Sequence, residues 1–204
     1  MSIGLPPAVD GFSSGEPALT VRRFTVAEYL RLHETEILTE DDRVELLEGI
    51  VVQKMTRIPR HDAAIDILAQ LLRRLLSDNW YVRDQKVLLT NDSAPEPDLV
   101  VLRGQPRDYW RKHPTAADAA IVLEVSESSL DRDRRKCRIY SKAGIAIYWI
   151  VNLEADCIEV HTQPDPTAGT YQHREVVPLT TPISFALPDG TAVTLPLDVA
   201  LNFQ

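Results

Sequence analysis

The clearest pattern of hydrophobic and polar positions lies between residues 61 and 76. Apolar side chains recur there every three or four positions, at Ala64, Leu68 and Leu72 among others, while polar residues such as Asp66 point elsewhere. This spacing matches one face of an α-helix. The segment is therefore predicted to be an amphipathic helix that packs on the core.

Two further helices are indicated by the residues at their ends. Thr25 and Glu28 form the S/T-x-x-E signature of a helix start, in which each side chain accepts a hydrogen bond from the backbone of the other residue. A short helix is expected from this point to about His33. Gly144 is well placed to end another helix, over residues 130–143, because glycine readily adopts the left-handed conformation that follows a helix.

Short apolar runs predict the strands. A hairpin that turns near Gly49 is expected from RVELLEG and IVVQKM, and later strands are expected in WYVRDQKVLLT, APEPDLVVL, AIVLEVSES and IAIYWIV. The last of these is apolar on both faces, so it is expected at the centre of a sheet. An antiparallel meander is expected from CIEVHTQ, TYQHREVVPL and TAVTLPL. This order of elements predicts an α/β domain in which helices flank one mixed sheet.

Length and composition favour a single globular domain. A chain of 204 residues is long enough for one sizeable core but short for two ordinary domains. Residues 1–19 carry Gly, Pro and Ser without periodicity and are expected to form a flexible N-terminal tail, which leaves residues 20–204 for the domain. The longest apolar run, at 145–151, is far short of the roughly 20 residues that span a bilayer. No signal peptide is evident, and Cys137 and Cys157 form neither a metal-ligand spacing nor a disulfide framework, so a reducing cytoplasm is expected.

The net charge of −8 argues against a uniformly basic nucleic-acid surface. Positive charge is nevertheless concentrated in two stretches. Six Lys or Arg residues lie within 132–142, and four lie within 103–112. A charged run is most often a solvated face, so the two basic stretches alone do not indicate a nucleic-acid site. The net negative charge of the chain weakens the hypothesis of a polyanion partner without excluding it.

Two acidic residues occupy apolar strands. Asp98 directly follows Pro97 at the start of one apolar run, and Glu124 lies inside AIVLEVSES with Val122 on its own face of the strand. A buried carboxylate is costly unless a cation or hydrogen bonds compensate it. One such acid could simply pair with a nearby arginine or cap a backbone group. Two on neighbouring strands favour a site for Mg²⁺ or Mn²⁺, because these hard cations prefer carboxylate oxygens and keep several waters.

The order of these motifs resembles a known group of nucleases. A Pro-Asp pair, a spacer, Glu-Val-Ser on a strand and then a helix are similar to the PD-(D/E)XK nuclease superfamily. More specifically, the chain resembles the Uma-type restriction endonucleases over about residues 22–155, through FTVAEYLRL, RVELLEGIVV, PEPDLVVL, VLEVSESS, a Lys-x-x-x-Tyr pair and AGIAIYWIVN, in family order. The resemblance implies a restriction-endonuclease-like core, metal-dependent hydrolysis of phosphodiester bonds, DNA as the partner, and a homodimer.

The resemblance also implies roles for individual residues. By position, Asp98 and Glu124 would be the metal ligands, with the backbone carbonyl of Val125 as a candidate third ligand. Glu45, in RVELLEG, matches an acid that could hold a second metal or orient a water molecule. These four residues define the predicted metal site.

One position departs from the superfamily pattern. The lysine expected two residues after the Glu is replaced by Ser126, whose hydroxyl cannot supply a positive charge. Relatives of this branch place the lysine on the following helix, where Lys136 fits, with Tyr140 one turn further on. The helix start is about one residue shorter than the family pattern, so Arg135 is a rival for the role. The lysine would offset negative charge in the transition state or position the attacking water.

The remaining candidates are interpreted as structural. Tyr140 is expected to pack in the core rather than to touch substrate. His61 is expected to be a partly exposed residue in the first turn of its helix. The other histidines show no ligand spacing.

Two functions remain open. The first is a metal-dependent endonuclease that cuts DNA, with RNA or a small nucleotide as variant substrates of the same site. The second is a catalytically weak or silent protein of the same fold that acts in nucleic-acid binding or assembly. Ser126 and the net charge favour the second, whereas the first is favoured by Glu45, Asp98, Glu124 and Lys136. A homodimer is expected because cutting both strands needs two sites, and because the apolar strands offer more surface than one chain of this size covers.

Overall fold

The computed structural model describes residues 20–55 and 58–197. The predicted flexible tail, residues 1–19, lies outside this part of the chain, and so do the last residues of the predicted domain. No helix among the described residues has the length and hydrophobicity of a membrane span. The helices are α1 (Val26–Glu34), α2 (Pro59–Leu75) and α3 (Leu130–Lys142), with short 3-10 helices η1 (Glu40–Asp42), η2 (Pro106–Tyr109) and η3 (Ala116–Asp118).

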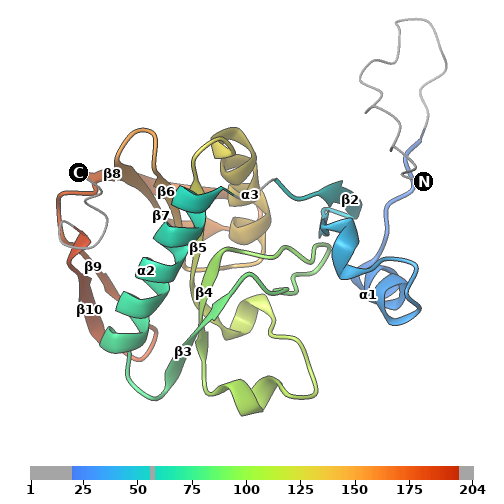
Figure 1. Ribbon diagram of the computed structural model, residues 1–204, viewed down its shortest axis with the longest axis horizontal. Helices are drawn as coiled ribbons and strands as arrows, with labels where there is room; N and C mark the ends of the chain where they lie inside the picture. The colour runs from blue at the N-terminus through green and yellow to red at the C-terminus, as the bar shows by residue number, and fades with distance from the viewer. Residues whose placement is uncertain (1–19, 56–57, 198–204) are drawn as a thin grey trace, which may run out of the picture.

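A six-stranded mixed sheet forms the centre of the fold (Figure 1). In spatial order its strands are β3 (Trp80–Asp84), β4 (Leu99–Arg103), β5 (Ala119–Ser126), β6 (Ile147–Asn152), β7 (Cys157–Asp165) and β8 (Thr170–Pro178). Only β5 and β6 run parallel, and α3 joins them, because parallel neighbours need a crossover connection. The expected central position of IAIYWIV is confirmed, since β6 has a partner on each side.

Helices cover both faces of this sheet. On one face, α2 packs against Leu123 and Val125 of β5, and on the other α3 packs against Val122 and Tyr148. Because successive residues of a strand point to opposite faces, Glu124 lies on the α3 side. The predicted mixed sheet flanked by helices is therefore confirmed.

The N-terminal part forms a separate small sheet beside this core. The capping box of Thr25 and Glu28 opens α1 as expected. The strands β1 (Val44–Leu47) and β2 (Ile50–Gln53) form the predicted hairpin, and Gly49 turns it with a φ of 80°. Leu46 forms an isolated antiparallel bridge with Ala94, so the hairpin lies against the segment that precedes β4.

Two strand predictions were wrong in extent or pairing. WYVRDQKVLLT is a strand only as far as Asp84, because Gln85 adopts a left-handed φ of 47° and turns the chain away. TAVTLPL does not continue the meander of β7 and β8. It contributes β10 (Ala192–Leu195), which pairs with β9 (Ile183–Ala186) in a second small sheet that covers the same face as α2.

The two basic stretches have different environments. The four cations of 103–112 are exposed, which confirms a solvated face there. The stretch on α3 is different, because Lys136 is buried and several of its arginines form ion pairs with acids on other elements. Most of this stretch therefore fastens the helix to the rest of the molecule.

Glu159 shows this fastening most clearly. Its side chain on β7 is only 2% exposed and pairs with Arg134 of α3 at 2.5 Å and with Arg174 of β8 at 3.1 Å. Burial raises the pKa of this carboxyl, but hydrogen bonds and charge attraction from the two arginines outweigh the effect and lower the pKa to about 2. The ionised form is therefore stabilised by folding.

Acid is expected to remove this contribution to stability. A folded-state pKa below the unfolded value means that the stabilisation is present above about pH 4.5 and is lost as pH falls toward 2. The arginines are half-exposed, so we expect a contribution of only about 1–2 kcal/mol. Urea denaturation at pH 7 and at pH 3 should show a larger loss of stability for the natural protein than for Glu159→Gln. Equal losses would contradict the pairing.

Candidate active site

A cavity of about 80 Å³ lies where β5, the start of β4, the β1–β2 hairpin, α2 and α3 meet. Asp98 directly precedes β4, and Glu124 lies near the end of β5. The antiparallel pairing of Leu99 with Leu123 brings these two acids side by side. The five predicted site residues all line the cavity: Glu45, Asp98, Glu124, Val125 and Lys136.

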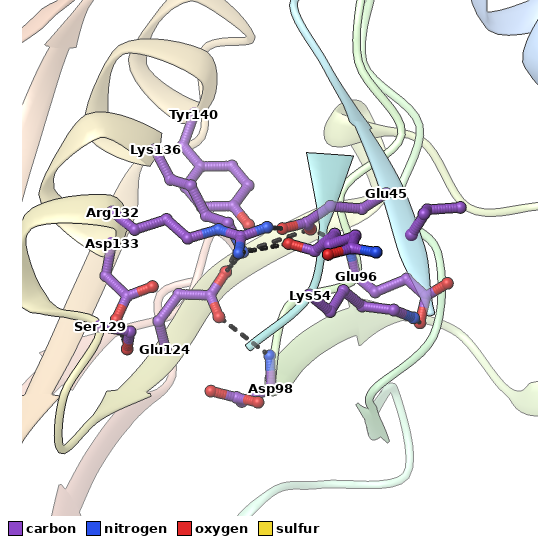
Figure 2. Close-up of polar contacts among 12 residues, drawn as sticks. Glu45, Lys54, Glu96, Asp98, Glu124, Ser129, Arg132, Asp133, Lys136 and Tyr140 are labelled. Carbon is purple, nitrogen blue, oxygen red and sulfur yellow. Dashed lines mark hydrogen bonds and ion pairs between the residues drawn. The ribbon is translucent and has the colours of Figure 1, made fainter. Parts of the chain in front are cut away.

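Asp98 and Glu124 are linked through the backbone of their strands. The amide of Asp98 donates to Oε2 of Glu124 at 3.4 Å (Figure 2). The amide of Val125 donates to Oδ2 of Asp98 at 2.8 Å. Both carboxylates therefore line one cavity at the sheet edge, where Glu124 contacts Lys136 of α3 and Asp98 contacts His61 of α2.

Lys136 points from α3 into this group of acids. Its Nζ lies 3.0 Å from Oε1 of Glu124 and 3.3 Å from Oε2 of Glu45 (Figure 2). Tyr140, one turn further along α3, donates from its hydroxyl to the same Oε1 at 2.8 Å. Arg135, the rival for this position, is exposed. Tyr140 is buried as expected, but it also contacts a predicted site residue.

Burial and neighbouring charges shift the proton affinities in this cluster. Burial raises the pKa of Glu124 to about 8, because the pull of Lys136 offsets only part of it while Asp98, Asp133 and Glu45 add repulsion. For Lys136, burial alone would lower the pKa, but Glu124, Glu45 and Asp133 outweigh it and raise the pKa above its usual value. The lysine is therefore a firmly protonated cation inside an acidic cavity.

His61 takes a place that the sequence interpretation missed. Its Nε2 lies 3.3 Å from Oδ2 of Asp98, and its side chain lines the cavity. Burial lowers the pKa of His61, but hydrogen bonds and charge attraction to Asp98 and Asp62 raise it to about 9. The spacing of the apolar residues of α2 could have indicated this position. His61 precedes Ala64 by three positions and Leu68 by seven, which places it on the buried face of the helix.

Three more residues around the cavity were not among the predicted site residues. Arg132 of α3 contacts Oε1 of Glu45 at 2.7 Å, and the amide of Glu96 donates to Oε2 of Glu45 at 3.1 Å. Asp133 is buried and accepts a hydrogen bond from Ser129. The contacts of Arg132 and Glu96 with Glu45 join segments far apart in the sequence, so neither periodicity nor local spacing could reveal them.

The residues of the cavity fit a divalent cation. Six carboxylates line it against four Lys and Arg side chains. Oε2 of Glu127 is buried and has no hydrogen-bond partner among the described residues. Asp98 and Glu124 offer carboxylate oxygens beside the backbone of Val125, and Mg²⁺ and Mn²⁺ prefer such oxygen donors.

Protein side chains alone would leave the coordination of that cation incomplete. In the part of the chain that the structure describes, no three His, Cys, Asp or Glu side chains converge into a ready-made metal site. This is compatible with Mg²⁺, which is often held by one or two carboxylates and completes its shell with water and substrate oxygens.

Comparisons with known proteins agree with this geometry. The sequence model of the Uma2 family, described as "Putative restriction endonuclease", matches residues 26–200. Among solved structures, the chain is similar to "a putative nuclease belonging to DUF820" from Anabaena variabilis ATCC 29413, with a TM-score of 0.64 and 18% identity over 87% of this chain and 99% of that one. At this identity the likeness shows a shared fold. No curated protein matches the sequence.

Proposed function

The chain belongs to the Uma2 family, and we propose that it acts as a restriction-type endonuclease that hydrolyses phosphodiester bonds of DNA with Mg²⁺ or Mn²⁺. The observation that carries this proposal is the contact of Lys136 with Glu124 in the cavity that also contains Asp98. Ser126 stands where the superfamily has its lysine, and Lys136 supplies a positive charge from α3 instead. Phosphodiester hydrolysis needs oxygen ligands for a cation and positive charge near the phosphate, and this cavity offers both.

The predicted ligands are not equally suited to bind the metal. Asp98, Glu124 and the backbone carbonyl of Val125 would hold the cation, which when bound would lower the pKa of a water molecule and stabilise charge on the phosphate. Glu45 already has both carboxylate oxygens engaged by Arg132, Lys136 and a backbone amide. These contacts favour a role for Glu45 in holding Lys136 over the role of ligand to a second metal.

The other residues would act by placing these groups. Lys136 would offset the negative charge that develops on the phosphate or hold the attacking water. Tyr140 fixes one oxygen of Glu124, and His61 fixes one oxygen of Asp98. The second oxygen of Glu124 accepts from the amide of Asp98, whereas His61 shares Oδ2 of Asp98 with the amide of Val125.

Metal binding tests the proposal directly. Isothermal titration calorimetry with Mn²⁺ should show binding that Asp98→Ala weakens by about tenfold or more, since second-sphere and ligand changes have effects of this size. Asp66→Ala, an exposed acid on α2, serves as the matched control and should bind like the natural protein. Equal binding by Asp98→Ala would show that the cation lies elsewhere, and cleavage that persists in EDTA would contradict metal dependence.

The catalytically silent alternative loses its main support. It was motivated by Ser126, but a buried lysine lies 3.0 Å from Glu124 in the same cavity. The geometry therefore favours an active nuclease.

A homodimer remains a proposal, and burial of the apolar run at 145–151 removes part of the apolar-surface reason for it. The apolar run at 145–151 was expected to need a partner, but Tyr148, Trp149, Ile150 and Val151 are fully buried within the chain. The main reason left is that cutting both strands of a duplex requires two active sites.

A further inference from the structure

A second, larger cavity of about 630 Å³ adjoins the candidate active site. It lies between α1, η1, the end of β2 and the segment that follows β3. Four residues line both cavities: Arg43, Lys54, Gln85 and Glu96. The two cavities are therefore adjacent parts of one depression.

The larger cavity is positively charged in a protein whose net charge is −8. Its walls carry Arg43, Lys54, Arg83 and Lys86, against only two acids, Glu40 and Glu96. Lys54 is neutralised by Glu96 at 2.5 Å. His33 and His113 add two imidazoles to the same walls.

Three of these cations have no acidic partner in the described part of the chain. Arg43, Arg83 and Lys86 form no ion pair there, although most cations of α3 do. Arg43 uses one guanidinium nitrogen to contact the backbone carbonyl of Met55 at 3.0 Å. Positive charges kept together without acids are suited to an anion from outside the protein.

We propose that this basic cavity, here called the flanking groove, binds backbone phosphates of the nucleic-acid strand that continues from the bond cleaved in the active site. The inference rests on the proposed nuclease function and adds the path of the substrate. Lys54 and Glu96 lie at the junction, and the amide of Glu96 contacts Glu45 beside Lys136. A strand with one phosphate at Lys136 would thus pass Lys54 and reach Arg83 and Lys86.

Phosphate contacts of this kind determine affinity and position without reading sequence. Arginine can bind phosphate oxygens through two parallel hydrogen bonds, and each neutralised phosphate releases counterions. Binding through the flanking groove should therefore depend steeply on salt.

The test measures binding without cleavage. Fluorescence anisotropy with a labelled DNA duplex in EDTA should show that Arg83→Gln/Lys86→Gln weakens binding by about tenfold or more and reduces the slope of log K against log salt by about two. Arg73→Gln/Arg74→Gln removes the same charge from the far end of α2, about 18 Å along the helix from His61. This control should bind like the natural protein.

The outcomes separate this inference from the function on which it rests. If the Arg83/Lys86 variant keeps the affinity and salt slope of the natural protein, the flanking groove is not the path of the strand, while cleavage by the natural protein would still support the nuclease. If the natural protein neither binds nor cuts DNA, the proposed function fails and the inference with it. Lys86→Gln alone, at an exposed position, gives the same test if the double variant does not fold.

Discussion

Glu124→Gln is expected to abolish DNA cleavage while the protein stays folded. The amide keeps the shape of the side chain but removes the negative charge that a cation and Lys136 would both use. Lys136 keeps its contact with Glu45 in this variant, so the buried lysine retains an acidic partner and the fold should tolerate the change. Loss of one group that stabilises a transition state typically lowers a rate by about 10²–10³, and loss of a metal ligand should be at least as severe. Initial rates of plasmid nicking, with thermal denaturation of the same samples, give the measurement.

Glu159→Gln is the matched control for this change. Glu124 of β5 and Glu159 of β7 are both paired with Ile150 of β6, which lies between them in the sheet. They therefore point to the same face of the sheet, about 10 Å apart. Glu159 pairs with arginines outside the cavity. Its amide variant should lose stability but keep the cleavage rate below its melting temperature. A Glu124→Gln protein that cuts at the natural rate would mean that the nuclease activity comes from another site or another protein.

The parts of the site that could be predicted from the sequence are those with a local signature. Asp98 and Glu124 stood out because a charge in an apolar strand is costly, and the strand pairing then placed them together. Lys136 could be preferred over Arg135 from helical phase, since adjacent residues differ by about 100° around the axis. The structure buries Lys136 and exposes Arg135.

The parts that could not be predicted depend on contacts between distant segments. The pairing of Arg132 with Glu45 joins residues 87 positions apart, and the contact of Glu96 with Glu45 joins residues 51 apart. Strand β9 alternates between buried and exposed residues, but it is only four residues long, which is too short for this pattern to predict a strand from the sequence. The flanking groove likewise arises only when α1 and the segment after β3 come together, because its cations are scattered from Arg43 to Lys86.

Lys136→Met is expected to lose both activity and stability. From the sequence alone, a lysine that extends to the strand ends could be removed at little cost, but its buried position changes that expectation. Methionine keeps the apolar stem and leaves Glu124 and Glu45 buried without their shared cation. Breaking a buried ion pair by removing one partner typically costs about 3–5 kcal/mol. Urea denaturation should show a loss of this order.

The activity loss can be separated from the stability loss. Single-turnover cleavage at saturating DNA, measured where circular dichroism shows the variant to be folded, should fall by about 10²–10³ because the phosphate loses a positive charge in its transition state. Arg135→Gln removes a charge from the next residue of the same helix, and its exposed position predicts normal stability, a normal single-turnover rate and at most a salt-dependent loss of DNA affinity. If Arg135→Gln instead showed the larger loss of rate, the cation of the site would be Arg135. A folded Lys136→Met protein with full activity would contradict the proposal that Lys136 of α3 takes the role of the strand lysine that Ser126 replaces.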